Sequence, residues 1–431
     1  CAPLLRLAAL LLTSLWLAMG PTQAWAVASG QDAVEASRLG TTPLSLTPYL
    51  DLLEDPGGAL TLEQIRAPGL AQQFKHSNFT GEALNFGITP SAWWLRLRVS
   101  NTSDQPIERL LEVAYARLSH LSFHAPQGDG SYRTIETGTT APFESRGYPH
   151  RHFVFSLRLP PQAEQTVYLR VASTTAFIVP IRLWEPAAFH TYERSDYAAQ
   201  AWYFGMAAAM VLFNLLLFIR LKDWLYLQYV GFALSMAFAL AAQNGLVKEV
   251  FRLESPLWSD LCTTFGYSFA LASGTLFLRR MVETPRLLPR LDPWLQGLVV
   301  FFLVSPLMFL VTGQTLIKAA AVTYLLAMVA LMAVALYAAW RRQRSAYFFL
   351  VAFALLGLGA ATNTLRAIGL VPTNVLTANA MQFGSALEML LLALALADRF
   401  NQMRRERAAM QAELLATQKA LIDTLRSSEQ R

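Results

Sequence analysis

The 431-residue sequence contains too few charged residues for an ordinary soluble protein of its size. Asp, Glu, Lys and Arg make up 15% of the chain, whereas soluble domains contain about 25%. The deficit lies in residues 200–398, which are strongly apolar, while residues 399–431 are polar and charged. This distribution excludes a wholly soluble protein and predicts a multi-domain membrane protein.

Cysteine is also scarce, since Cys1 and Cys262 are the only two. Signal cleavage would remove Cys1, so one mature chain could form no disulfide framework. The net charge of +6 is not accompanied by the clustered basic and aromatic residues of a nucleic-acid site, and we expect no nucleic-acid partner. Catalytic motifs are lacking too, and we expect no cofactor.

The first 26 residues have the pattern of a secretory signal peptide. Arg6 supplies the positive charge, residues 7–19 form the apolar stretch, and residues 24–26 (Ala-Trp-Ala) fit the cleavage site. The alternative is a first membrane anchor, although the apolar stretch is short for that role. Residues 27–44 are polar, and we expect a flexible lead there.

Residues 45–185 alternate between apolar and polar side chains with the period of a β-strand. The alternation is clearest in residues 93–99, 153–159 and 167–171, and turn-forming stretches separate such runs. Several short strands of this kind are typical of an all-β sandwich. We therefore predict a periplasmic jelly-roll sandwich.

Two adjacent tryptophans begin the best of these strands. Trp93 is in register with the apolar residues Leu95 and Leu97, whereas Trp94 is in register with Arg96. Because neighbouring strand residues point to opposite faces, Trp93 is the better candidate for the core. The other face is a candidate for binding a ligand or docking onto the membrane helices. Its candidate residues, taken together with a polar residue at the end of the strand, are Trp94, Arg96, Arg98 and Asn101.

Histidine occurs as two pairs with a spacing of two, His120 with His124 and His150 with His152. Two histidines on one strand face could hold a metal ion. No Cys, Asp or Glu has a convincing spacing to complete such a site. We therefore expect surface histidines and no metal.

Seven apolar segments follow a short linker at residues 186–199, and each is long enough to cross about 30 Å of hydrocarbon. The predicted seven-helix domain covers residues 200–398. Its spans are residues 200–219, 224–243, 257–278, 293–312, 316–340, 346–368 and 375–397.

The charges of the connecting loops predict the topology. An exported N-terminus and an odd number of crossings place the C-terminus in the cytoplasm. The predicted inner loops and the start of the tail then carry 13 Lys and Arg residues, against four near the outer ends, as the positive-inside rule requires. Those four are Lys248, Arg252, Lys318 and Arg366.

Polar residues inside the predicted spans are costly in a bilayer and are therefore candidates for function. Asn214, Gln228 and Glu388 lie at similar predicted depths, and we expect a polar cluster that acts as a transmembrane switch. Hydrogen bonds that only pack the helices are the alternative. A retinal protein is excluded, because the seventh span has no lysine that could form the Schiff base. A transporter is disfavoured, because the sequence shows no pair of broken helices of the kind that form transport sites.

The tail, residues 399–431, continues the last helix, because no Gly or Pro occurs from Leu396 to Arg431. Its apolar residues recur at a four-three spacing, which predicts a coiled coil and a parallel homodimer. The alternative is an amphipathic helix that lies on the lipid headgroups.

Several motifs together resemble the bacterial 7TMR-DISM family, the seven-transmembrane receptors with diverse intracellular signalling modules. The extracellular domain of its second type has a motif that here reads Gly87, Thr89, Trp94, Arg96 and Asn101. The first and seventh predicted helices, with Asn214 and Glu388, are also similar to the family. The resemblance implies a jelly-roll sensor, a seven-helix transducer and a cytoplasmic output, often a diguanylate cyclase or a histidine kinase.

The sequence therefore predicts a bacterial inner-membrane receptor with a periplasmic N-terminal domain and a cytoplasmic C-terminus. Its expected partners are the lipid bilayer, a periplasmic small molecule, carbohydrate or protein, and an output module in cis or in trans. One alternative is a truncated diguanylate cyclase or histidine kinase whose catalytic module lies beyond Arg431. The other is a scaffold that assembles partners through the coil.

Overall fold

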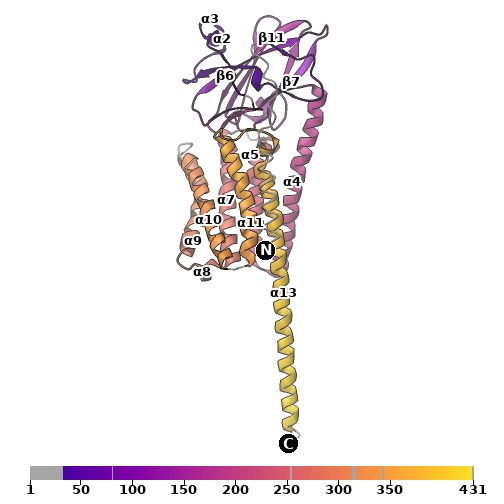
Figure 1. Ribbon diagram of the computed structural model, residues 1–431, viewed down its shortest axis with the longest axis vertical. Helices are drawn as coiled ribbons and strands as arrows, with labels where there is room; N and C mark the ends of the chain where they lie inside the picture. The colour runs from indigo at the N-terminus through magenta and orange to yellow at the C-terminus, as the bar shows by residue number, and fades with distance from the viewer. Residues whose placement is uncertain (1–32, 80, 253–254, 313–316, 342–343, 430–431) are drawn as a thin grey trace.

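A computed structural model describes residues 33–79, 81–252, 255–312, 317–341 and 344–429. A β-domain sits on one end of a helical bundle, and the last helix extends far beyond the other end (Figure 1). We call the end that faces the β-domain the outer end and the opposite end the inner end. The predicted signal peptide, residues 1–26, lies outside the described residues.

The larger sheet of the β-domain contains the tryptophan strand β6 at its centre. Its order is β4 (Lys75–His76), β3 (Leu50–Asp55), β6 (Ala92–Asn101), β11 (Ala163–Ala172), β8 (His120–Pro126) and β9 (Tyr132–Thr137), and β1 (Val34–Glu35) also pairs with β6. Both β3 and β11 run antiparallel to β6.

A second sheet packs against the first. Its order is β10 (Phe153–Leu159), β7 (Ile107–Val113), β13 (Ile181–Trp184) and β2 (Leu44–Ser45), and a separate pair joins β12 (Phe177–Val179) to β5 (Leu84–Gly87). Apolar residues from both sheets form one buried core, in which Phe123 of β8 stacks on Phe155 of β10 with ring centroids 4.5 Å apart. The alternating pattern thus builds a two-layer β-domain, because each strand turns its apolar side to the other sheet.

The prediction of a flexible lead at residues 27–44 is wrong for residues 33–44, the part that the structure describes. Val34 pairs with Val99 of β6, and Leu44 pairs with Leu183 of β13. Val34 is 2% exposed, so burial and strand pairing hold this segment in the domain.

The helical region begins without a break after β13. Its long helices are α4 (Pro186–Leu221), α5 (Trp224–Gln243), α7 (Pro256–Val282), α9 (Asp292–Thr312), α10 (Ile317–Trp340), α11 (Arg344–Ala367) and α13 (Ala380–Glu429). Within the described residues, five helices are long and apolar enough to cross a membrane, and the apolar stretches Asp292–Met308 and Leu326–Trp340 are shorter. The short helices α6 (Leu246–Phe251), α8 (Thr284–Leu287) and α12 (Val375–Ala378) lie in connections.

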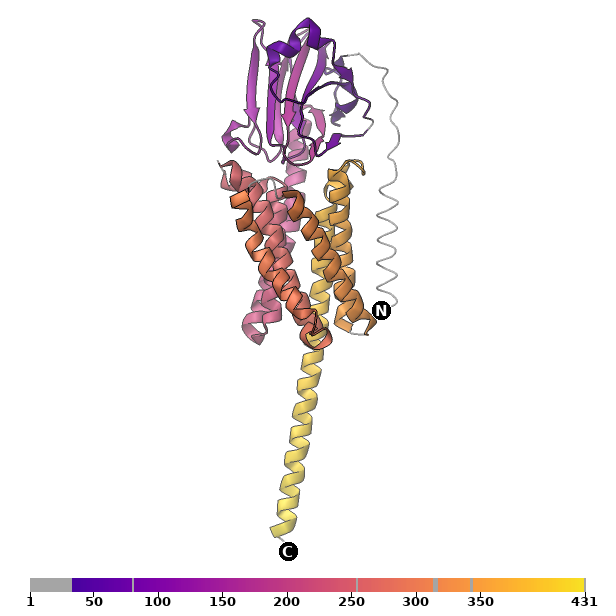
Figure 2. The ribbon, with the colours of Figure 1, turned by 90° about the vertical axis from the view of Figure 1, so that its left-hand side faces the viewer.

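The predicted linker at residues 186–199 is also corrected, because these residues are the first turns of α4. Phe189 packs with Trp184 and Leu110 of the second sheet, and Trp184 stacks on Tyr192 at 4.7 Å between ring centroids. Helix α4 is therefore anchored in the β-domain before it enters the bundle (Figure 2).

Small residues allow two helix pairs to pack closely. A Cβ atom on Gly266 of α7 would lie 2.6 Å from Cα of Ala239 on α5. Likewise, Cβ atoms on Gly359 of α11 and Gly384 of α13 would approach the carbonyl oxygens of Ala380 and Leu355 at 2.6 and 2.8 Å. Close backbone approach at small residues is a common way of packing helices in membranes.

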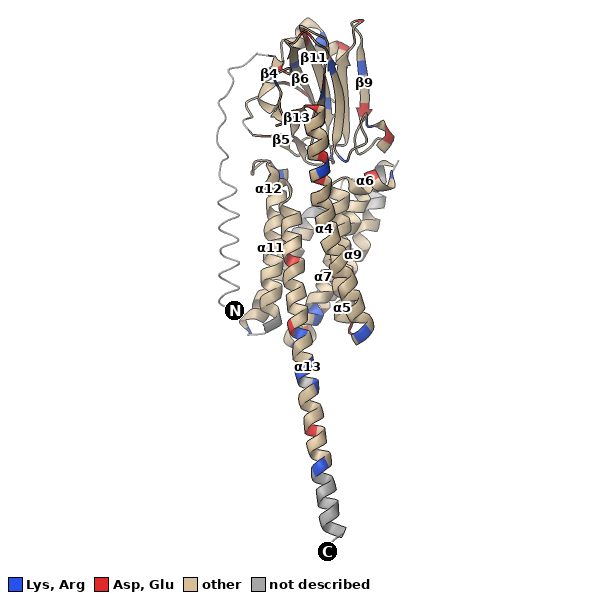
Figure 3. Ribbon diagram, turned by 90° about the vertical axis from the view of Figure 1, so that its right-hand side faces the viewer, with Lys and Arg blue, Asp and Glu red and all other residues tan. Residues whose placement is uncertain are grey.

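Helix α13 has 50 residues and continues from the bundle without interruption, as the sequence predicts. At 1.5 Å per residue it is about 75 Å long. Beyond the bundle Met410 and Leu414 are 60% and 63% exposed, and Figure 3 shows basic residues where the helix leaves the bundle. The pairing of two such helices in a coiled coil stays a prediction.

Candidate functional site at the domain junction

The β-domain rests on the outer helix ends through polar contacts at three places, all of them at least partly buried. The first is Lys248 of α6, which is 4% exposed. Its ammonium group donates to the carbonyl oxygens of Gly138 and Thr139, each at 2.8 Å, and to that of Ala141. The three donors of the ammonium are thus used by one loop of the β-domain.

Arg151 makes the second contact. Its Nε and Nη2 atoms each lie 2.8 Å from a carboxylate oxygen of Asp196 on α4, and its Nη1 donates to the carbonyl oxygen of Asn244 at 3.2 Å. The Arg151 amide also donates to the Tyr197 hydroxyl, which donates to Glu249 of α6 at 2.6 Å. One β-domain residue therefore contacts both α4 and the outer connection after α5.

The third contact involves the end of α11. The side chain of Asn85 donates to the carbonyl oxygen of Arg366 at 2.6 Å. Gly87, from the family motif, lies beside it with φ at 68°, and a Cβ atom there would be 3.5 Å from the Ile368 carbonyl oxygen. This motif glycine therefore lies where β5 meets the helices, in a backbone conformation that favours glycine.

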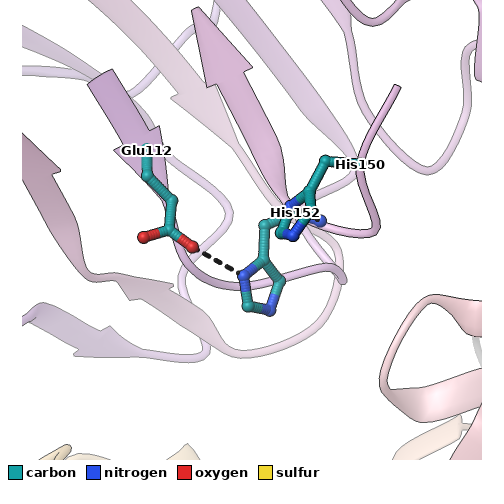
Figure 4. A group of neighbouring side chains, drawn as sticks. All are labelled: Glu112, His150 and His152. Atoms are coloured by element: carbon teal, nitrogen blue, oxygen red, sulfur yellow. Dashed lines mark hydrogen bonds and ion pairs between the residues drawn. The ribbon is translucent and has the colours of Figure 1, made fainter. Parts of the chain in front are cut away.

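Figure 4 shows a buried group of ionisable side chains, in which Glu112 lies near His150 and His152, the two sequence neighbours of Arg151. Nδ1 of His152 is hydrogen-bonded to Glu112 at 2.8 Å, and Nε1 of Trp184 donates to the other Glu112 oxygen at 2.9 Å. His150 packs against His152 and accepts the His152 amide at 3.0 Å through its own Nδ1. The expectation of surface histidines is wrong here, because Glu112 and His150 are 0% exposed and His152 is 7% exposed.

Burial sets the protonation of this group. It raises the pKa of Glu112 and lowers that of His150 to about 3 and that of His152 as well. Ligand atoms of Glu112, His150 and His152 lie within 4.8 Å of one another, close enough to share a metal ion. Two features work against a metal: Glu112 already uses both oxygens, and nearby arginines place positive charge around the group.

Next to these contacts lies a cavity of about 1330 Å³ between the β-domain and α4, α11 and α13. Its wall combines apolar surface with polar groups from both parts of the chain. The polar lining includes Thr89, His120, Arg151, Gln200, Asn244, Asn363, Arg366 and Gln382.

Arg366 is unusual in this wall, because it is as buried as Arg151, at 6% exposure, without the ion pair that Arg151 makes among the described residues. Its guanidinium donates to Asn363 at 3.2 Å and lies 6.0 Å from the ring of Tyr115. Among the described residues it has no carboxylate partner, and its Nε atom has no acceptor. Since a buried unpaired charge is costly, the cavity favours an occupant that carries a negative charge.

The predicted ligand face of β6 has a different environment. Trp94 is 1% exposed and packs with Leu53, Phe74 and Tyr168, beneath α2 (Leu62–Arg66) and α3 (Pro68–Ala71). Helices α2 and α3, which cover this face, lie at the end of the β-domain remote from the bundle (Figure 1). The position offers neither an exposed ring nor a surface that docks onto the membrane helices. Trp93, as its register predicts, packs against the main core, stacked on Phe86 at 3.9 Å.

The other predicted residues of β6 make contacts within the domain. Arg96 pairs with Asp51 through Nε and Nη2 at 3.1 and 2.9 Å and lies 4.5 Å from the Phe74 ring centroid. Asn101 is 1% exposed and ties the end of the strand to the carbonyl oxygens of Gln105 and Pro160, each at 2.8 Å. Arg98 is half-buried. Thr89, which precedes β6, accepts a hydrogen bond from the Ser91 amide through its hydroxyl at 3.2 Å.

The predicted transmembrane residues lie within the bundle without a described bond between them. Glu388 is 0% exposed, and its two oxygens have no hydrogen-bond partner among the described residues. Asn214 donates within its own helix to Met210 at 2.9 Å, and Gln228 is half-buried. Near Glu388, the hydroxyls of Tyr203 and Ser385 are 2.9 Å apart and join α4 to α13. The switch stays a prediction.

Sequence reasoning missed Lys248 and Arg366 as junction residues, although a signal was present. Both stood out as basic residues on the outer side, where the positive-inside rule disfavours them. Glu112 gave no such signal, because 40 residues separate it from His152.

Comparison with known families agrees with this division of the chain. The family described as 7TMR-DISM extracellular 2 matches residues 47–185, which include the β-sandwich. The family described as 7TM diverse intracellular signalling matches residues 196–399, which include the helical bundle. Among curated proteins, none matches the chain. The matched domains indicate a membrane protein of receptor-like signalling type with an N-terminal extracellular part. The chain belongs to the 7TMR-DISM family.

Proposed function

We propose that the protein is an inner-membrane receptor that senses a periplasmic ligand and passes the signal to the cytoplasm. Its β-domain is a jelly-roll sensor, its bundle crosses the membrane seven times, and α13 ends in the cytoplasm. The observation that carries this proposal is the polar contact of the β-domain with α4, α6 and α11. A domain held this way can bias the helices only if the ligand prefers one of two arrangements.

The junction cavity is the best candidate for the ligand site. It has room for a small molecule, since typical ligand pockets measure about 300–1,000 Å³. Gln382, Asn244 and Asn363 offer hydrogen bonds, and Arg366 offers a positive charge. We infer that the ligand is a polar molecule with a negative charge, such as an acidic sugar.

The signal passes along α4 and α13. Gln200 of α4 accepts a hydrogen bond from Gln382 of α13 at 2.8 Å, one turn above the contact of Tyr203 with Ser385. Both glutamines line the cavity, and Glu388 lies one turn below Ser385. A ligand that parts or tightens α4 and α13 would move the tail, whose coiled-coil pairing in a homodimer then acts on an output module in cis or in trans.

A thermal-shift screen of the full chain in lipid nanodiscs tests the ligand site. We expect glucuronate or galacturonate to raise the unfolding midpoint in a saturable way, and the uncharged parent sugars to do less. Arg366→Gln should abolish the shift. Arg252→Gln is the matched control, because Arg252 is also an outer arginine but its side chain is 69% exposed and outside the cavity. Equal shifts in both variants would refute the cavity as the site.

A further inference from the structure

A basic pocket lies at the inner end of the bundle, where α13 leaves it. The cavity measures about 320 Å³ and is formed by the turn between α4 and α5, the end of α7 and the emerging part of α13. Its lining residues are Leu221, Lys222, Asp223, Arg280, Arg399, Phe400, Met403, Arg404 and Arg407. Five of them are basic and one is acidic.

The single acidic residue is already engaged. Asp223 accepts the Leu225 amide at 3.0 Å and so caps the first turn of α5. The same oxygen lies 3.5 Å from Nε of Arg280. Lys222 adopts a left-handed conformation with φ at 57°, which ends α4 and turns the chain into the pocket.

The remaining cations lack compensation among the described residues. Arg399, Arg404 and Arg407 have no ion pair there, and Arg404 lies over the Phe400 ring at 5.9 Å. Asp398, which precedes Arg399 in α13, accepts a hydrogen bond from Gln402 at 3.1 Å. Like charges gathered in one cavity repel one another, and an anion relieves that repulsion.

A buried polar group lies close to two lining residues of the pocket, Asp223 and Arg399. The hydroxyl of Tyr226, in the first turn of α5, has no hydrogen-bond partner among the described residues, and Tyr226 is 0% exposed. It is close enough to Asp223 and Arg399 to interact electrostatically with both. Tyr226 is not itself one of the lining residues, so the proposed site rests on the cations of the wall.

We propose that this pocket binds the phosphate of an anionic phospholipid headgroup. Leu221, Phe400 and Met403 supply apolar surface beside the cations, and the apolar part of α4 ends at Leu221, where headgroups are expected. Basic pockets between helices on the cytoplasmic side are suited to such headgroups. A bound phosphate would bridge α13 to the α4–α5 turn and to α7, and so restrain the signalling helix.

Lipid titration of the full chain in dodecyl maltoside tests this proposal independently of any outer ligand. Phosphatidylglycerol should raise the thermal unfolding midpoint in a saturable way, whereas phosphatidylcholine should not. The Arg399→Gln, Arg404→Gln, Arg407→Gln triple variant should weaken the apparent affinity roughly a hundredfold, since each basic residue contributes about a factor of five. Lys at the same three positions should restore most of the binding.

The matched control removes three inner arginines that do not line the pocket, Arg286, Arg290 and Arg341, by the same change to Gln. It should bind phosphatidylglycerol like the wild type, and equal losses in both triple variants would overturn the proposal. A further arm adds pyrophosphate without lipid. Saturable stabilisation by pyrophosphate, together with none by phosphatidylglycerol, would overturn the lipid source in favour of a soluble phosphate.

Discussion

Arg151 of the β-domain and Asp196 of α4 form a bidentate ion pair, with both N–O distances at 2.8 Å. The side chains are 7% and 14% exposed, so the pair is largely shielded from water. Because the two residues belong to different parts of the chain, the β-domain cannot rotate on α4 without disturbing this pair. The pair is therefore a direct mechanical link between the two parts.

Breaking this pair should loosen the junction. Asp196→Asn leaves the Arg151 charge buried without its partner, and we expect the stability of the full chain to fall by about 3 kcal/mol. Glu82→Gln, which breaks the more exposed pair with Arg182, should cost less than about 1 kcal/mol. Thermal unfolding in micelles measures both, and equal losses would contradict a special role of Arg151 and Asp196.

Lys248→Met should release the loop that contains Gly138 and Thr139. The variant keeps much of the side-chain volume but leaves three carbonyl oxygens without their donor, at a cost of about 1–3 kcal/mol for each buried unsatisfied group. Amide hydrogen exchange at residues 138–141 should become faster. Unchanged exchange in the variant would show that the ammonium group does not hold this loop.

Gly245→Ala should push the β-domain away from the outer end of α5. Gly245 has φ at 81°, and a Cβ atom would lie 2.7 Å from Cβ of Ala116 and 2.9 Å from the carbonyl oxygen of Arg151. The left-handed conformation alone costs about 1–2 kcal/mol for a non-glycine residue. Gly205→Ala is the control, because nothing lies within 4 Å of its Cβ position in α4, and there the change should be neutral or stabilising. Equal unfolding midpoints of the two variants would argue against a tight junction.

The β-domain should lose stability as the pH falls from 7 to 5. Burial lowers the pKa of His150 to about 3, whereas an unfolded histidine titrates near 6.5. The unfolded chain therefore takes up a proton in this range and the folded chain does not, so this histidine costs about 2 kcal/mol by pH 5. Burial raises the pKa of Glu112, which acts in the opposite direction above pH 4.5 and offsets part of the loss.

His150→Gln should reduce that pH dependence, as measured by the unfolding midpoint at pH 7 and pH 5. His190→Gln is the matched control, because the His190 side chain is 53% exposed. An identical pH dependence in wild type and His150→Gln would show that His150 is not the group responsible.

Glu388→Gln and Glu388→Ala should alter signalling while the protein stays in the membrane. Glu388 is fully buried within the described bundle, one turn from the Ser385 contact with Tyr203. Disulfide cross-linking through Leu414→Cys on the exposed tail reports on the pairing of α13. We expect both variants to change the cross-linking rate, and unchanged rates in both would remove Glu388 from the signal route.

Strand β6 shows what an alternating sequence pattern can predict about side-chain burial and what it cannot. Alternation correctly separates Trp93 from Trp94, because successive side chains of a strand point to opposite faces. It does not reveal that α2 and α3 cover the second face and bury Trp94 as well. A polar-looking face can hold a second small core, and only the placement of the covering segment decides this.

The sequence by itself determined the division of the chain into an alternating β-domain, apolar helices and a charged final helix. Periodicity and hydropathy are properties of short stretches of sequence, so they can be read without knowing how the elements pack. Tertiary structure alone decided which polar residues meet, such as Asn85 with Arg366, which are 281 residues apart. It also joined the expected lead to the sheets, made the expected linker part of α4, and buried His150 with Glu112, because such contacts depend on how the elements pack and not on spacing along the chain.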